Sequence, residues 1–181
     1  MKLMIASDIH GSAYYCRKMI EAFENEKADR LLLLGDILYH GPRNDLPKDY
    51  NPKEVLAMLN GIKENIMCVR GNCDAEVDQM VLEFPIMAEY SILELGGSTI
   101  YATHGHIHNP ENPPMLKQGD ILLNGHTHVP VCEDKGRFIY MNPGSVSIPK
   151  ENSAHCYMIY EGKFIWKDVE TGAVLEIGGS M

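Results

Sequence analysis

The stretch K-L-M-I-A-S-D-I-H-G, residues 2–11, is a short apolar run followed directly by a polar turn. Such a run is typical of a strand that is buried on both faces of a sheet. Ser12 then caps a predicted helix that extends to about Lys27, with apolar residues at helical spacing between them. A buried strand followed by an amphipathic helix is the unit from which layered α/β folds are built.

Two more strands of this kind are predicted in the first half of the chain. They are R-L-L-L-L at 30–34 and N-I-M-C-V-R at 65–70. A helix is predicted after Pro52, which suits the first turn of a helix, and a short helix over 74–82. The stretch 40–52 holds three prolines and is predicted to be a long loop, of the kind that is usually functional or disordered.

The pattern changes after Phe84 to strands with few helices between them. The predicted strands are 90–95, 98–103, 120–124, 137–141, 155–160 and 163–169, with hairpin turns at 96–97 and 161–163. We therefore expect parallel pairing early in the chain and hairpins late. The sequence contains no internal repeat and no domain linker, so the chain is predicted to be a single domain over residues 1–181.

Composition excludes several classes of protein. The net charge of −9 argues against binding of a nucleic-acid polymer, although bound cations could still attract a phosphate substrate. No apolar run approaches the roughly 18 residues of a membrane helix, and the first predicted strand leaves no room for a signal peptide. Five cysteines without a C-x-x-C pair favour a reduced, cytoplasmic protein over a disulfide framework.

Side chains that can bind metals occur in five short signatures, four of which follow a predicted strand. The signatures are S-D-I-H-G, L-G-D, R-G-N-C-D, T-H-G-H and G-H-T-H, and they supply Asp8, His10, Asp36, Asn72, His104, His126 and His128. Residues at i and i+2 of a strand point the same way, so Asp8 and His10 can share one ion. The signatures predict that these side chains converge on one rim, where a two-metal phosphoesterase centre fits.

Each signature also has an ordinary structural interpretation. A buried histidine is more often a packed or hydrogen-bonded core residue than a ligand, Gly-Asp after a strand is commonly a turn, and Asn after Gly usually bonds its own backbone. All of these interpretations would have to hold at once for the metal centre to be absent. The combination, in this order, therefore favours the metal centre.

The ordered signatures resemble those of the calcineurin-like metallophosphoesterase superfamily, and most closely its small bacterial and archaeal phosphodiesterase branch. H-G-P-R-N at 40–44 and N-P-G-S-V-S-I-P-K at 142–150 strengthen that resemblance, which covers about residues 3–150. Membership implies a four-layer αββα sandwich, in which two mixed sheets face each other with helices outside. It also implies that the site lies at the carboxyl ends of the strands.

The resemblance implies two divalent metal ions per chain. Asp8, His10 and His128 match the ligands of the first ion, Asn72, His104 and His126 match those of the second, and Asp36 would bridge both. A donor set without thiolate suits manganese (Mn2+) or iron (Fe2+) better than a closed structural zinc site, and Zn2+, Co2+ or Ni2+ would also be accepted. The implied mechanism is attack on phosphorus by a hydroxide that bridges the two ions.

Four further residues are predicted to assist the reaction. Many superfamily members carry a histidine after the asparagine, whereas this chain has Cys73, whose unperturbed pKa of about 8.5 makes it a weaker acid than imidazolium. The acid would then come from His106 or Asp74, or the substrate would need a good leaving group. Arg43 is predicted to contact the substrate phosphate. Each of three residues also has a structural interpretation. Cys73 would be an inert packed thiol, His106 would support the ligands, and Arg43 would be a solvated loop residue.

The expected function is hydrolysis of a small phosphodiester or an activated phosphate ester. A nucleotide phosphatase and a 2′,3′-cyclic nucleotide phosphodiesterase are alternatives within the same chemistry. A protein-interaction scaffold like the small retromer subunit, which has the same fold, is the alternative from another class. The complete ligand set favours the enzyme. The resemblance alone suggests a homo-oligomer.

Overall fold

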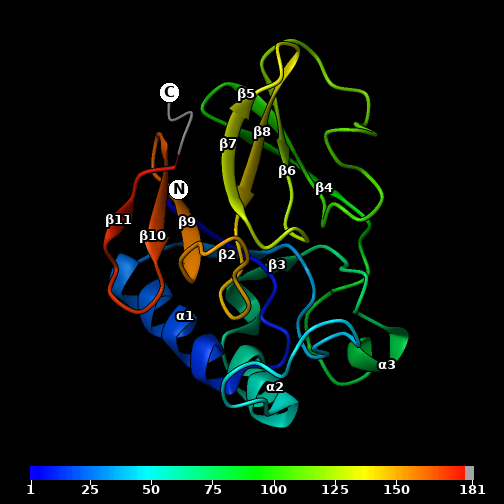
Figure 1. The fold of residues 1–181 in the computed structure, drawn as a ribbon, viewed down its shortest axis with the longest axis vertical. Helices are drawn as coiled ribbons and strands as arrows, with labels where there is room; N and C mark the ends of the chain where they lie inside the picture. Colours follow the sequence, from blue (N-terminus) through cyan, green and yellow to red (C-terminus); the bar gives the residue numbers. More distant parts are fainter. Residues whose placement is uncertain (178–181) are drawn as a thin grey trace.

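Two mixed β-sheets face each other in the computed structural model, which describes residues 1–177 (Figure 1). The first sheet has the strand order β11-β10-β9-β1-β2-β3 and is made of β1 (Leu3–Ala6), β2 (Arg30–Leu33), β3 (Ile66–Cys68), β9 (Cys156–Tyr160), β10 (Phe164–Asp168) and β11 (Val174–Leu175). The second sheet has the order β4-β5-β6-β8-β7 and is made of β4 (Ser91–Leu95), β5 (Ser98–Ala102), β6 (Asp120–Leu123), β7 (Pro130–Asp134) and β8 (Phe138–Pro143). The predicted single domain includes residues 178–181, which lie outside the described residues.

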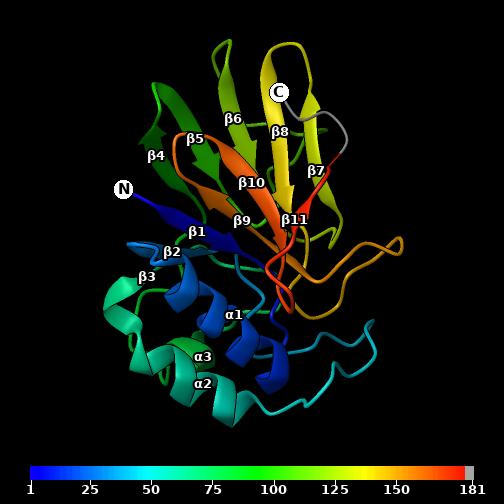
Figure 2. The same cartoon turned by 90° about the vertical axis from the view of Figure 1, so that its left-hand side faces the viewer.

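Helices cover the outer face of the first sheet (Figure 2). They are α1 (Ala13–Glu26) and α2 (Pro52–Gly61), whose apolar residues pack in the cluster against this sheet. The chain also has a single turn of helix, α3 (Glu76–Gln79), and a 3-10 turn at Lys63–Asn65, neither of which has a buried residue. The predicted caps are present. The Ser12 hydroxyl accepts a hydrogen bond from the Tyr15 N–H, and Pro52 lies in the first turn of α2. The helix predicted over 74–82 is shortened to α3.

Strand β1 is buried on both faces, as its unbroken apolar run predicts. Met4 and Ala6 pack in the cluster beneath the helices, whereas Leu3 and Ile5 pack in the cluster between the two sheets. Because side chains alternate along a strand, this one short segment contributes to both cores. The turn that follows it is thereby fixed in the middle of the molecule.

The outer face of the second sheet carries its own small apolar cluster, of Leu122, Phe138 and Tyr140 with Leu116. Leu116 belongs to the connection between β5 and β6, so within residues 1–177 a loop forms this outer layer and no helix residue joins the cluster. Three prolines at 110, 113 and 114 disfavour a helix in that connection. The facing mixed sheets with helices outside are confirmed, and the second outer layer is irregular.

Strand pairing departs from the sequence prediction in the second half of the chain. Hairpins join β4 to β5 and β9 to β10 as expected, but β5, β6 and β8 pair in parallel. The expected late hairpins are therefore present, and the parallel pairs among β5, β6 and β8 were not predicted. Strand β7, which begins at Pro130, was not predicted; it is an edge strand, where a proline is tolerated.

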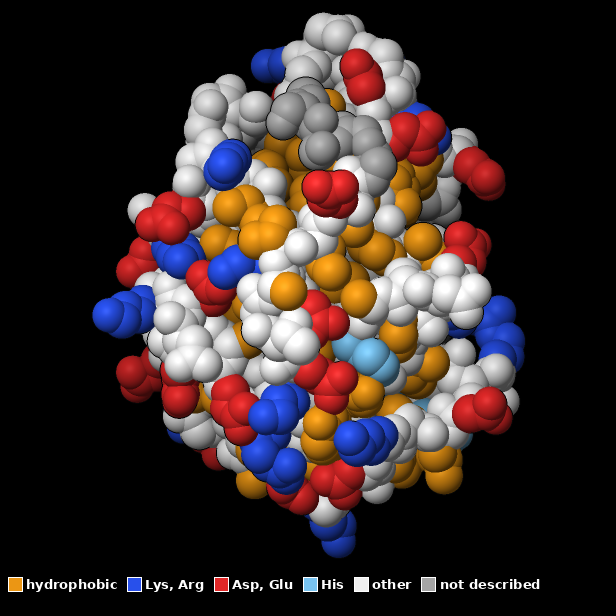
Figure 3. Space-filling view, turned by 60° about the vertical axis from the view of Figure 1, so that its left-hand side comes forward, with side chains coloured by type: hydrophobic (Ala, Val, Ile, Leu, Met, Phe, Trp, Pro, Cys, Tyr) orange, Lys and Arg blue, Asp and Glu red, His pale blue; other side chains and the backbone are white. Residues whose placement is uncertain are grey.

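The surface carries charges of both signs. On the face that Figure 3 shows, basic side chains lie among acidic ones, and hydrophobic side chains gather across its middle. Within the described residues, no helix is long and apolar enough to cross a membrane.

Candidate metal centre

All seven predicted ligands lie just beyond the carboxyl ends of five strands. They follow β1, β2 and β3, which pair in parallel in the first sheet, and β5 and β6, which pair in parallel in the second. Backbone hydrogen bonds join neighbouring turns, for example from His10 N–H to the Asp36 carbonyl (2.9 Å) and from Gly125 N–H to the His104 carbonyl (2.9 Å). Parallel strands place their carboxyl ends at one edge, and ligands of α/β sheets usually bind there.

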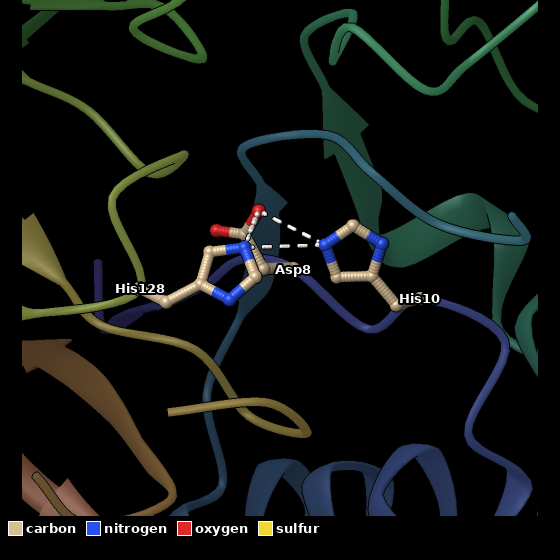
Figure 4. Close-up of side chains that lie close together, drawn as sticks. All are labelled: Asp8, His10 and His128. Atoms are coloured by element: carbon tan, nitrogen blue, oxygen red, sulfur yellow. Dashed lines mark hydrogen bonds and ion pairs between the residues drawn. The ribbon is translucent and has the colours of Figure 1, made fainter. Parts of the chain in front are cut away.

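The first group consists of Asp8, His10 and His128 (Figure 4). The two imidazole Nε2 atoms lie 3.2 Å apart, and the Asp8 Oδ1 atom lies 3.6 Å from that of His10 and 3.2 Å from that of His128. All three side chains are buried. The three donor atoms therefore converge on one point, as the ligands of a single ion must.

The second group consists of Asn72, His104 and His126. The Nε2 atom of His104 lies 3.0 Å from Asn72 Oδ1 and 3.2 Å from His126 Nδ1. His104 is fully buried, whereas Asn72 is exposed and His126 is half-buried. This group thus stands closer to the solvent than the first.

Asp36 lies between the two groups. Its Oδ2 atom is 3.6 Å from His10 Nε2 and 3.5 Å from His104 Nε2. Its other oxygen accepts a hydrogen bond from the Cys73 N–H over 2.8 Å. One carboxylate oxygen is therefore within reach of both groups, while the other holds the carboxylate in place.

Five of the seven ligand residues have a left-handed backbone. The φ angles are positive at Asp8, His10, Asp36, His126 and His128, between 49° and 66°. Residues other than glycine rarely adopt this region, although asparagine, aspartate and histidine do so more often than the rest, and such residues cluster at functional sites. The left-handed turns redirect side chains away from the strand direction and toward the centre.

Two glycines allow the turns to approach each other closely. A Cβ atom on Gly71 would lie 2.1 Å from Asp36 Oδ1, and one on Gly125 would lie 1.9 Å from Ser7 Oγ and 2.8 Å from Asp8 Oδ2. Neither distance is compatible with a side chain. These glycines are therefore needed for the packing of the carboxylates rather than for flexibility.

Backbone carbonyls orient three of the histidines. The Nδ1 atoms of His10, His104 and His128 donate to the carbonyl oxygens of Tyr39 (2.8 Å), Leu34 (2.6 Å) and Ile148 (2.6 Å). In a neutral imidazole this contact places the proton on Nδ1 and leaves the Nε2 lone pair facing the centre. Histidine ligands of metals are commonly held in this way.

Burial and the neighbouring charges shift the pKa values of two of these histidines. Burial alone would lower the pKa of His104, but the Asp36 and Asp8 carboxylates raise it to about 9. Burial and the charge of His104 lower the pKa of His126 to about 4. The site thus favours positive charge at its centre, which a proton or a metal cation can provide.

The arrangement of donor atoms fits a pair of divalent cations. Asp8 Oδ1 is buried without a hydrogen-bond donor, and two imidazole lone pairs face each other across 3.2 Å. Without a cation this geometry leaves a desolvated acceptor and a lone-pair repulsion, both of which cost free energy. A cation bound among the nitrogen and oxygen atoms would relieve both.

A cavity of about 390 Å³ opens over the centre, and two of the predicted assisting residues line it. Cys73 and Arg43 are in its wall, together with Lys150 and Thr127, which were not predicted. Burial and the charges of Asp36 and Asp74 raise the pKa of the Cys73 thiol to about 12. The sequence offered one signal for Lys150, namely its place at the end of the motif N-P-G-S-V-S-I-P-K.

Asp74 and His106 are placed differently from Cys73. Asp74 is buried behind the centre, where its carboxylate accepts hydrogen bonds from the N–H groups of Asp36, Ile37 and Gly71. That position does not fit the substitute acid that we expected. His106 is exposed, with its ring centroid 5.4 Å from that of His104, and it lines a separate cavity beside the centre.

Comparisons with known proteins agree with the fold and the motifs. Residues 1–163 match the calcineurin-like phosphoesterase superfamily domain. The chain is 50% identical over 157 residues to phosphodiesterase YfcE of Escherichia coli (strain K12), over 87% of this chain and 85% of that protein. The solved structure of that phosphoesterase superposes with a TM-score of 0.94 at 44% identity, over 97% of both chains.

A more distant structure shares the fold alone. Vacuolar protein sorting 29 from Cryptosporidium parvum superposes with a TM-score of 0.60 at 18% identity, over 96% of this chain and 94% of that one. The family match over most of the chain confirms the resemblance expected from the motifs, and with it the expectation of a phosphoric ester hydrolase. The chain belongs to the calcineurin-like phosphoesterase superfamily.

Proposed function

We propose that this protein is a metal-dependent phosphodiesterase that hydrolyses a small phosphodiester or an activated phosphate ester. The observation that carries the proposal is the position of Asp36 Oδ2, 3.6 Å from His10 Nε2 and 3.5 Å from His104 Nε2. One carboxylate oxygen shared by two donor groups is the arrangement that a two-cation centre needs. The similarity to a protein named phosphodiesterase supports the choice of substrate class.

We assign the residues to two cations as the resemblance to the superfamily implies. Asp8, His10 and His128 would hold one cation, Asn72, His104 and His126 the other, and Asp36 both. When bound, such a pair lowers the pKa of water and neutralises charge on the phosphate oxygens. We expect manganese, because nitrogen and oxygen donors without thiolate do not select strongly for a structural zinc site.

The chain contributes position and charge rather than a nucleophile. Ser145 Oγ donates to the Asp8 carbonyl over 2.9 Å, and the buried Ser7 lies against Gly125, so neither hydroxyl lines the cavity. The attacking oxygen is then that of water. Arg43 and Lys150 line the cavity and attract the substrate phosphate, because each carries a positive charge there.

The scaffold alternative rests on the shared fold of vacuolar protein sorting 29. Against it stands the complete donor set. Five of its residues adopt a left-handed backbone, which costs free energy and is retained where function requires it. A scaffold would gain stability by losing these residues.

The test is hydrolysis of bis(p-nitrophenyl) phosphate by metal-stripped protein to which manganese, zinc, nickel or magnesium is restored separately. We expect turnover that depends on the added metal. A panel with a nucleoside monophosphate and a 2′,3′-cyclic nucleotide separates the phosphatase and cyclic phosphodiesterase alternatives. Absence of both metal-dependent turnover and tight metal binding would leave the scaffold as the better account.

A further inference from the structure

A second cavity, of about 300 Å³, adjoins the metal centre on the side of the second donor group. It is lined by Arg70, Gly71, Asn72, Glu89, His106 and Ile107. Asn72 lines both this cavity and the one over the centre. A phosphate bound at the centre would therefore have one open space on either side of Asn72, and the two ester groups of a phosphodiester need two such spaces.

The walls of this second cavity are held in place by hydrogen bonds. The Arg70 N–H donates to the Ala88 carbonyl (2.8 Å), which ties the turn after β3 to the segment before β4. The Asn112 side chain donates to the Ile107 carbonyl (3.0 Å), and Thr103 Oγ1 donates to the Glu89 carbonyl (3.0 Å). The cavity is thus formed before any ligand binds, which lowers the entropic cost of binding.

The charges of the two cavities differ. Arg43 and Lys150 line the first, where the only carboxylate is the metal-binding Asp36. The second is lined by one basic side chain, Arg70, and one carboxylate, Glu89, so these two charges of its lining sum to zero. An anionic group is therefore attracted to the first cavity, and a neutral group with polar edges is favoured in the second.

Ile107 supplies the apolar part of this wall. Its side chain is 47% exposed, and a single exposed isoleucine is ordinary on a protein surface. Here it stands beside charged groups that can donate and accept hydrogen bonds. A flat group with an apolar face and polar edges, such as a nucleoside, matches that combination.

We propose that the second cavity binds one ester group of the phosphodiester substrate, and that this group is neutral and polar with an apolar face. The inference rests on the proposed function and adds the substrate class to it. Ile107 and Glu89 are then residues that determine specificity. They contact the ester group and take no part in breaking the bond to phosphorus.

The kinetic test compares two chromogenic diesters with the manganese-loaded protein. Methyl p-nitrophenyl phosphate has a small second group, whereas the p-nitrophenyl ester of thymidine 5′-phosphate has a neutral nucleoside. We expect kcat/KM to be about tenfold higher for the nucleoside ester, since contacts of this size discriminate by roughly that factor. Ile107→Ala and Glu89→Gln should each reduce the ratio about fivefold, through KM.

Ile92→Ala is the matched control, because Ile92 is an exposed isoleucine on β4 that does not line this cavity. It should leave the ratio unchanged. A ratio that stays at the wild-type value in both Ile107→Ala and Glu89→Gln would overturn the proposed subsite while leaving the phosphodiesterase intact. Absence of turnover with both esters would instead overturn the phosphodiesterase.

A binding measurement tests the subsite even if the protein has no phosphodiesterase activity. In protein with labelled isoleucine methyl groups, titration with thymidine should shift the methyl resonance of Ile107 and leave that of Ile92 in place. The shift should be lost in Glu89→Gln if the carboxylate holds the nucleoside. An unmoved Ile107 resonance in the wild type would contradict binding in this cavity.

Discussion

Asp74 holds the backbone of Asp36. Its Oδ2 atom accepts hydrogen bonds from the N–H groups of Asp36 (2.9 Å) and Gly71 (2.7 Å). Asp36 reaches both donor groups, and Gly71 leads into Asn72, so this one buried carboxylate positions two turns of the metal centre. Its importance is therefore in positioning, through the residues that it holds.

Replacement of Asp74 by asparagine should weaken both the fold and metal binding. An amide keeps one acceptor oxygen but points an amino group at backbone donors that would lose their partner. We expect a loss of about 2 kcal/mol of stability and about tenfold or more in metal affinity. Urea unfolding and metal titration measure the two effects. Asp134→Asn is the control, because Asp134 also accepts a backbone bond, from Gly136, but is exposed.

Asp36→Ala should remove activity with every metal. The variant loses the one oxygen that lies within reach of both donor groups. A metal pair contributes several kcal/mol to a reaction of this kind, so the rate should fall by at least about 10³-fold. Activity is measured with bis(p-nitrophenyl) phosphate and bound metal by elemental analysis. Full metal content together with retained turnover would show that Asp36 does not bridge.

Cys73→Ser should leave hydrolysis of bis(p-nitrophenyl) phosphate within about threefold of the wild type. Burial and nearby carboxylates raise the pKa of this thiol to about 12, and a p-nitrophenolate leaving group needs no acid. The wild type should also prefer this diester over p-nitrophenyl phosphate in a parallel assay. A hundredfold loss in the variant, or a clear preference for the monoester, would give the thiol a larger role.

Arg43→Gln should raise KM for diesters about tenfold and change kcat less. Arg43 lines the cavity over the centre, and its guanidinium is expected to bind the phosphate in the ground state as well as in the transition state. Arg17→Gln, on the exposed surface of α1, is the control. An unchanged KM would show that Arg43 is a solvated loop residue that does not contact the substrate phosphate.

Glu26→Gln should destabilise the protein at neutral pH, and the difference in stability from the wild type should shrink as the pH falls below about 4. Burial alone would raise the pKa of Glu26, but ion pairs with Lys167 and Lys2 outweigh it and lower the pKa. A lowered pKa in the folded state gives stability that is present above the unfolded value of about 4.3 and is lost as pH falls through the folded value.

We expect a difference of about 1 kcal/mol at pH 7, measured by urea unfolding, because the pair is only partly buried. The difference should vanish once the pH lies below the folded-state pKa, where the wild-type carboxylate is protonated. Glu21→Gln is the control, since its pair with Lys18 is exposed on the same helix. A difference that persists at acid pH would assign the effect to packing.

Local sequence was enough to predict most of the strands and helices. Ser12 and Pro52 mark helix starts through contacts within one turn, and apolar runs mark buried strands. Strand β7 was missed because P-V-C-E-D lacks a clear apolar alternation. The parallel pairing of β5, β6 and β8 depends on crossover connections, which the hairpin signals around them do not reveal.

The predicted metal donors converge in space, but their supports were not predictable from the same motifs. The role of Asp74 depends on N–H groups 37 and 38 residues away in the chain. The carbonyl of Ile148, which orients His128, is likewise distant in sequence. Motifs identify side chains with metal chemistry, whereas the supporting roles of Asp74 and of the Ile148 carbonyl depend on contacts between distant turns, which the motifs do not reveal.

The left-handed turns have a consequence for protein design. Copying the seven donor side chains onto regular strands of another scaffold would reproduce their chemistry but aim them in the wrong directions. The transferable unit is a set of backbone turns that includes Gly71 and Gly125, which leave the room that the carboxylates fill. A centre of this type is encoded as much by the path of the main chain as by the atoms that would touch a cation.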